Sequence, residues 1–182
     1  QAVNPIYILV FGLLLTFLWG ILAKMKLEPS TTMKFSFGLL QLGLGFGVLW
    51  YGSQHCDTRG MVGLQWLFIC YLLHTTGELC LSPVGLSMVT KLSPTRLVST
   101  VMGAWFLATA LSSYLAAVIA TFTEVADESG NIPIPIDTVD IYGTVFKNIA
   151  IAAIASGAIC MALVPLLNKW MHEEVVEDEE DA

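Results

Sequence analysis

Five long apolar segments constrain this chain more than any other feature of its sequence. A helix rises about 1.5 Å per residue, so roughly 20 apolar residues cross the hydrocarbon core of a bilayer, about 30 Å thick. Five segments reach or approach this length: residues 6–23, 35–51, 61–90, 97–122 and 141–167. The sequence therefore predicts an all-α, polytopic membrane protein with five transmembrane helices.

The composition agrees with a body embedded in a membrane. Of the 182 residues, 55% are hydrophobic and 13% are charged, which is about half the charged fraction of a soluble domain. The net charge of −7 belongs to residues 171–182, which hold seven acidic side chains and neither Lys nor Arg. We expect residues 1–170 to form one transmembrane bundle. The acidic segment has too little apolar surface to offset its ordering entropy, so we expect a disordered tail.

The basic residues between the segments predict the orientation of the chain. If the five segments cross the membrane alternately, one side carries six Lys and Arg residues and the other carries two. The six are Lys24, Lys26, Lys34, Lys91, Arg96 and Lys169, and the two are Arg59 and Lys147. Because short cytoplasmic loops are enriched in Lys and Arg, the side with six is expected to be cytoplasmic, and the acidic tail with it.

The third segment carries Glu78, which is the only acidic side chain within the five apolar segments. An ionised carboxylate at the bilayer centre costs about 2.5–3.5 kcal/mol, so such a group faces a water-filled cavity, binds a partner or holds a proton. Pro83 follows among residues that also interrupt the hydrophobicity, and it frees a carbonyl one turn back. This pattern is typical of a substrate or ion pathway. The simpler interpretation is that Glu78 hydrogen-bonds a neighbouring helix.

Counting residues from the predicted turn at Ser93-Pro94 places three side chains at one depth. Glu78 lies about 22 Å and Ser82 about 16 Å from this turn along one helix, and Trp105 lies about 18 Å along the next. In an antiparallel hairpin the three would share a layer near the midplane. A carboxylate, a hydroxyl and an aromatic ring there would suit a polar organic ligand with a cationic end. Trp105 alone could equally fill lipid-facing or core space.

Small residues predict where helices pack closely. Gly43 and Gly47 form a GxxxG pair, and a stripe of small residues recurs at every fourth position of the fourth segment. The stripe consists of Ala104, Ala108, Ser112, Ala116 and Ala120. We expect both features to be helix–helix contacts. The loop 123–140 contains an Ile-Pro-Ile-Pro-Ile stretch that we expect to stay extended.

His74 lies four residues before Glu78 and therefore on the same helix face. It could relay protons or be a hydrogen-bonded structural side chain. A redox membrane subunit with bis-histidine haem needs a second histidine at membrane depth, and the other two lie outside the apolar segments. An intramembrane protease needs paired aspartates, a Ser–His pair or a HExxH motif; no segment contains an aspartate, and the HTTGE run at residues 74–78 lacks the second histidine. The four cysteines have no metal-ligand spacing, so we expect no metal.

Two runs of residues carry a resemblance to a known family. They are GELCLSPVGLSMVTKL at residues 77–92 and MGAWFLAT at residues 102–109, and VNPI at 3–6 and LEPS at 27–30 add to them. In these runs the chain resembles the proton-dependent oligopeptide transporters of the major facilitator superfamily, of bacterial type. The resemblance covers the chain up to its tail, and it implies that the five segments are helices 8–12, most of the C-terminal six-helix bundle.

The resemblance implies a symporter, not an enzyme, that imports di- and tripeptides with protons by alternating access. Glu78 matches the glutamate that pairs with the peptide's amino terminus. Asn4, Ser82 and Trp105 match other peptide-contacting positions, although counting back from Lys24 puts Asn4 near the outer rim unless its helix tilts. The bending points of the cytoplasmic gate would be Gly77, Pro83 and Gly85.

The same resemblance implies the partners and the location of the protein. The N-terminal half of the transporter would lie upstream of Gln1, because the chain does not begin with Met and the family's other motifs are absent. The protein would lie in the bacterial inner membrane, with protons as the coupling ion, no other cofactor and no nucleic-acid partner. A carrier of amino acids or nitrate from the same family, or a membrane subunit without transport activity, remains open.

Overall fold

A computed structural model describes residues 3–121 and 134–171, and over these residues the chain forms five α-helices. They are α1 (Val3–Lys24), α2 (Thr31–Ser53), α3 (Leu64–Leu92), α4 (Val98–Thr121) and α5 (Pro135–Met171). Each is long and apolar enough to cross a membrane, judged by length and composition. The prediction of an all-α protein with five spans is confirmed. The predicted disordered tail lies outside the described residues.

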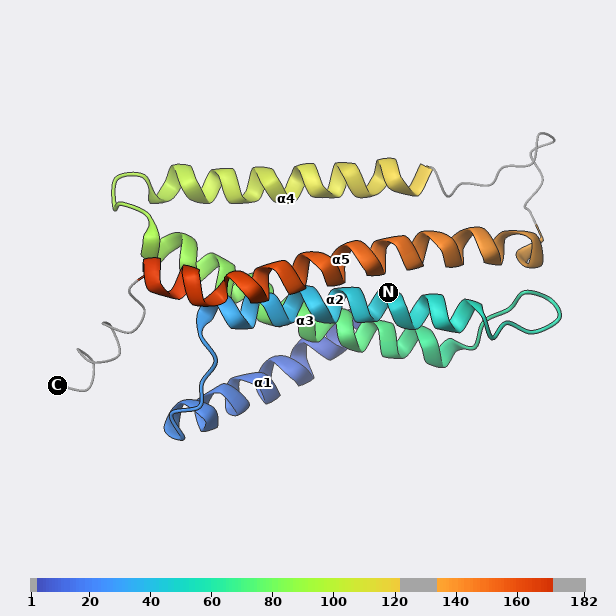
Figure 1. The fold of residues 1–182 in the computed structure, drawn as a ribbon, viewed down its shortest axis with the longest axis horizontal. Coiled ribbons are helices and arrows are strands. Elements are labelled where there is room, and N and C mark those ends of the chain that lie inside the picture. The colour runs from blue at the N-terminus through green and yellow to red at the C-terminus, as the bar shows by residue number, and fades with distance from the viewer. Residues whose placement is uncertain (1–2, 122–133, 172–182) are drawn as a thin grey trace.

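Helix α2 is at the centre of the bundle. It packs against α3 on one side and α5 on the other, while α1 packs against α3. Figure 1 shows α4 set apart from the other helices along most of its length, and of the described helices it packs against α3 alone. Four helices therefore form a compact group, and the fourth span joins it through the end of α3.

The helix ends differ from the predicted spans by a few residues, and the starts of α3 and α5 show why. Helix α3 begins at Leu64 and not at Met61, because the Asp57 carboxylate accepts the backbone N–H groups of Arg59 and Met61, both at 2.9 Å. Helix α5 begins at Pro135, six residues before the predicted start at Ile141. The expectation that the Ile-Pro-Ile-Pro-Ile stretch stays extended is therefore wrong at its end. Proline suits the first helical position, where its missing N–H has no partner to lose.

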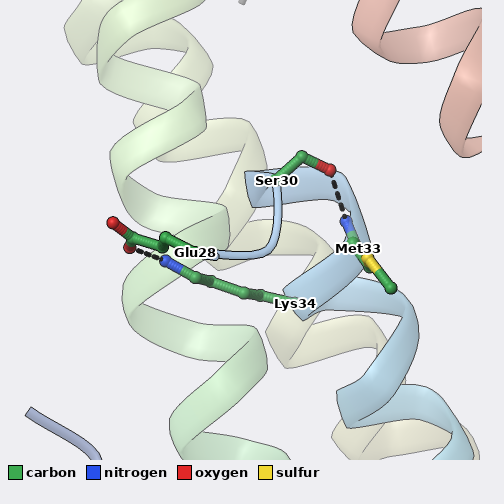
Figure 2. Close-up of polar contacts among 4 residues, drawn as sticks. All are labelled: Glu28, Ser30, Met33 and Lys34. Carbon is green, nitrogen blue, oxygen red and sulfur yellow. Dashed lines mark hydrogen bonds and ion pairs between the residues drawn. The ribbon is translucent and has the colours of Figure 1, made fainter. Parts of the chain in front are cut away.

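The connection from α1 to α2 is held by local polar contacts (Figure 2). The Ser30 hydroxyl caps α2 by accepting the Met33 N–H at 3.3 Å, as the Pro29-Ser30 helix-start signal predicts. The Lys34 ammonium pairs with the Glu28 carboxylate. It also lies 4.9 Å from the centre of the Trp19 ring on α1. A single cation thus links α1, the loop and α2 at this end of the bundle.

Glycines set the distance between α2 and its neighbours, but only one of them belongs to the predicted pair. Gly38, Gly45 and Gly52 recur every seventh residue and face α3, where a methyl group at Gly38 would lie 2.7 Å from the Gly77 carbonyl oxygen. Gly43 faces α5, and a methyl group there would lie 2.9 Å from the Ile154 nitrogen. At Gly47, no atom of the described residues lies within 4 Å of such a methyl group. The GxxxG prediction is therefore correct for Gly43 and wrong for Gly47.

The small-residue stripe of α4 lies on an exposed part of this helix. Ala104, Ala108, Ser112, Ala116 and Ala120 are all exposed. The helix–helix contact expected along this stripe stays a prediction.

A partly buried hydrogen bond joins the start of α2 to the end of α5, and its loss should be measurable. The Thr32 hydroxyl donates to Asn168 Oδ1 at 2.7 Å, and Thr32 is buried. Thr32→Val should destabilise the protein by about 1–2 kcal/mol, because it leaves the Asn168 oxygen without its donor. The measurement is the Tm of the purified full-length protein in detergent. Thr109→Val is the control, because the Thr109 hydroxyl bonds only the Trp105 carbonyl of its own helix. Equal Tm values for the two variants would contradict the prediction.

Candidate functional site

A cavity of about 410 Å³ lies where α1, α2 and α3 meet. Its volume falls within the range of about 300–1,000 Å³ that is usual for small-molecule sites. The lining residues come mostly from one face of α3, with the rest from the other two helices: Asn4, Gly38, Leu42, Tyr71, His74, Gly77, Glu78, Leu81 and Ser82. Three of the predicted substrate-binding residues, Asn4, Glu78 and Ser82, are thus brought to one cavity.

The Glu78 side chain is exposed at this cavity. Within residues 3–121 and 134–171, no hydrogen bond or ion pair engages its carboxylate. The alternative in which Glu78 only bonds a neighbouring helix therefore finds no partner in the described part of the chain. An unpaired carboxylate at a cavity wall is available for a cationic ligand or a proton.

Asn4 reaches the same cavity from the first turn of α1. Its Oδ1 accepts a hydrogen bond of 2.6 Å from the Thr75 hydroxyl, three residues before Glu78. Thr75 has no exposed surface and lies about 25 Å along α3 from Leu92. The bond to Thr75 therefore puts Asn4 near the level of Glu78 along α3. Figure 1 shows α1 crossing α3 obliquely.

His74 lines the cavity with a side chain whose polar atoms already have partners. Its Nε2 lies 3.3 Å from the Leu42 carbonyl oxygen, and its Nδ1 lies 3.7 Å from Cys70 Sγ. Its ring centre is 4.8 Å from that of Phe46, and the ring fits against Gly45. Of the two interpretations of His74, these contacts favour the hydrogen-bonded structural one.

Trp105 lines a different cavity, of about 450 Å³, between α2, α3, α4 and α5. The tip of its indole ring contacts Gly85, and a methyl group there would lie 2.9 Å from Trp105 Cζ2. The Trp105 side chain therefore lies about one helical turn closer to the connecting turn than the layer predicted to hold it with Glu78 and Ser82. Side chains lean toward the N-terminus of their helix. In an antiparallel pair Trp105 leans toward the connecting turn, whereas Glu78 and Ser82 lean away from it.

Two of the three predicted bending points have packing contacts. Gly77 and Gly85 are buried, and a methyl group at Gly77 would lie 2.9 Å from the Gly38 carbonyl oxygen. Pro83 lies within α3, which continues as one helix to Leu92. The glycines allow α2 and Trp105 to approach α3 closely. Their role in bending remains a prediction.

Tyr71 and Thr75 belong to the site but were not singled out from the sequence. Tyr71 lines the cavity, and Thr75 bonds Asn4. They lie seven and three residues before Glu78, so both are on its face of α3. This spacing could have identified Tyr71. No sequence signal pairs Thr75 with a residue 71 positions away.

Comparisons with known proteins agree on one family. The sequence model described as the POT family matches residues 1–139. The chain is 33% identical over 174 residues to the peptide transporter YePEPT of Yersinia enterocolitica, covering 94% of this chain and 32% of that protein. It is 33% identical over 181 residues to dipeptide and tripeptide permease B of Aliivibrio fischeri, covering 99% of this chain and 36% of that protein.

A solved structure has the same arrangement of helices. It is described as a crystal structure of the peptide transporter POT in complex with sulfate, and it is 31% identical with a TM-score of 0.77. The match covers 93% of this chain and 31% of that one. The chain therefore spans about a third of the length of the curated relatives and of the structure that it matches.

Proposed function

The chain belongs to the POT family, and from this membership we propose that the protein containing it is a proton-coupled symporter that imports di- and tripeptides. The single observation that carries the proposal is the unpaired Glu78 carboxylate at a cavity shared with Asn4 and Ser82. The names of the relatives, which describe peptide transporters and a permease of dipeptides and tripeptides, support the choice of substrate.

In this proposal Glu78 binds the amino terminus of the peptide. An ammonium–carboxylate contact is a charge-assisted hydrogen bond, and it is stronger in a cavity within the membrane than in water. Asn4 and Ser82 add neutral hydrogen bonds from the same cavity. No metal or other cofactor is required, because the proton is the coupling ion.

Trp105 is proposed to contact the distal end of the peptide. It contacts Gly85, which lies about 10 Å beyond Glu78 along α3. An extended tripeptide spans up to about 10 Å. The second cavity, which Trp105 lines, would then bind the end of the peptide that is distant from its amino terminus.

Transport is proposed to proceed by alternating access between two six-helix bundles. The five helices of this chain form most of the C-terminal bundle, and an N-terminal half of the kind present in the longer relatives is its partner. Gly77, Pro83 and Gly85 are the proposed bending points of α3. The protein would span the inner membrane of a bacterium, surrounded by lipid, with its acidic tail in the cytoplasm.

Uptake by the full-length protein in proteoliposomes tests the proposal. With an inward proton gradient, uptake of labelled di-alanine should exceed uptake without the gradient several-fold, and other dipeptides should compete. Liposomes without protein are the control. Uptake of di-alanine at the same rate with and without the proton gradient would contradict proton coupling. No uptake of any peptide by folded protein would contradict the substrate, and a family carrier of another small solute would replace it.

A further inference from the structure

Two neighbouring threonines of α3 use their hydroxyl groups differently. The Thr76 hydroxyl bonds its own helix, at 2.9 Å from the Leu72 and 3.2 Å from the Leu73 carbonyl oxygen. This is the usual arrangement for threonine in a helix. The Thr75 hydroxyl instead donates to Asn4 on α1 at 2.6 Å, from a fully buried position. This bond joins side chains of α1 and α3 beside the cavity.

In this bond the Asn4 oxygen, rather than its nitrogen, lies next to the Thr75 hydroxyl. A hydroxyl has one hydrogen to donate, and a side-chain amide has one accepting oxygen and one donating nitrogen. Because the Thr75 hydrogen goes to Oδ1, the oxygen of Asn4 faces Thr75. Within the described residues no atom accepts a hydrogen bond from Asn4 Nδ2, and Asn4 lines the cavity.

We propose that Thr75 is a positioning residue, which orients Asn4 so that its N–H groups serve the ligand. This inference rests on the proposed function. The cavity then offers an acceptor, the Glu78 carboxylate, and a donor, Asn4 Nδ2. These match the two adjacent groups at the start of every peptide, the terminal ammonium and the first carbonyl oxygen. Asn4 thus recognises the first peptide carbonyl, and Thr75 acts through Asn4 without touching the peptide.

The test uses the full-length protein and five variants: Thr75→Val, Thr75→Ser, Thr76→Val, Asn4→Ala and the double variant Asn4→Ala/Thr75→Val. The Kd for di-alanine is measured by calorimetry in detergent, with Tm as the measure of folding. Thr75→Val and Asn4→Ala should each raise the Kd about tenfold, as loss of one hydrogen bond in the site does. The double variant should equal Asn4→Ala alone. Thr75→Ser, which keeps the hydroxyl, and Thr76→Val should bind like the unaltered protein.

A second ligand separates positioning from a structural role. Thioxo-di-alanine carries sulfur, a weak acceptor, in place of the first carbonyl oxygen. The unaltered protein should prefer di-alanine over this analogue, and Thr75→Val should lose the preference. A preference that Thr75→Val retains would overturn the inference, as would additive effects in the double variant or a normal Kd for Asn4→Ala. If the unaltered protein binds no peptide, the proposed function fails as well. Whether the unaltered protein binds di-alanine therefore distinguishes a failure of the proposed function from a failure of the role of Thr75 alone.

Discussion

Glu78→Gln should weaken the binding of di-alanine to the full-length protein by about 30-fold to 4,000-fold. Removing one partner of a desolvated charge pair costs about 2–5 kcal/mol, and no side chain in the described part of the chain pairs with this carboxylate. Glutamine keeps the size of the side chain, so folding should persist. The measurements are the Kd for di-alanine and the proton-driven uptake rate in proteoliposomes, with Tm as the measure of folding.

The charge of the ligand gives this prediction a second readout. The unaltered protein should bind di-alanine much more tightly than N-acetyl-di-alanine, which has no ammonium, and Glu78→Gln should reduce this difference. Glu28→Gln is the matched control, because the Glu28 carboxylate pairs with Lys34 at the end of the bundle, outside the cavity. An unchanged Kd in Glu78→Gln, or an undiminished preference for the free amine, would contradict the role of Glu78.

Gly38→Ala should be the most destabilising single-methyl change along α2. The added carbon would lie 2.5 Å from Leu81 Cγ and 2.7 Å from the Gly77 carbonyl oxygen. The second atom belongs to the backbone of α3, so the two helices must separate. Overpacking of this kind costs about 1–3 kcal/mol, and the Tm of the full-length protein in detergent should fall by several degrees. Peptide affinity should fall too, because Gly38 lines the cavity.

Gly47→Ala is the control for this change, because it makes the same substitution in the same helix. In the part of the chain that the structure describes, nothing lies within 4 Å of the added carbon. Alanine also favours the helix by about 1 kcal/mol over glycine in water. Its Tm should be equal to or above that of the unaltered protein. Equal decreases in Tm for Gly38→Ala and Gly47→Ala would mean that glycine acts through flexibility rather than through the close contact of α2 with α3.

The existence of the helices could be predicted more reliably than their ends. Apolar length alone identifies all five spans, because about 20 predominantly apolar residues in a helix are enough to cross the hydrocarbon core. The ends depend on local contacts that hydropathy does not report. The Asp57 carboxylate keeps Met61 outside α3 by accepting its N–H, and Pro135 starts α5 early because its missing N–H is harmless at a first turn.

The site could be predicted where its residues share one helix. Glu78 and Ser82 are four positions apart, so the helical period alone puts them on one face. Asn4 and Trp105 lie on other helices, and the period says nothing about where those helices cross α3. The resemblance to the family supplied Asn4, and its bond to Thr75 became visible only in the structure. Trp105 has the right depth by residue counting, but its side chain leans toward the connecting turn and lines another cavity.

The sequence by itself determined the five spans and the single carboxylate that needs a polar environment, because both follow from the cost of placing groups in lipid. Only the tertiary structure decided which neighbours these features have. Gly38 and Gly43 are alike in sequence, but one faces α3 and the other α5. In a membrane the helices gain little from burying apolar surface against each other, so close packing and hydrogen bonds choose the neighbours. These interactions exist only between helices already placed in space.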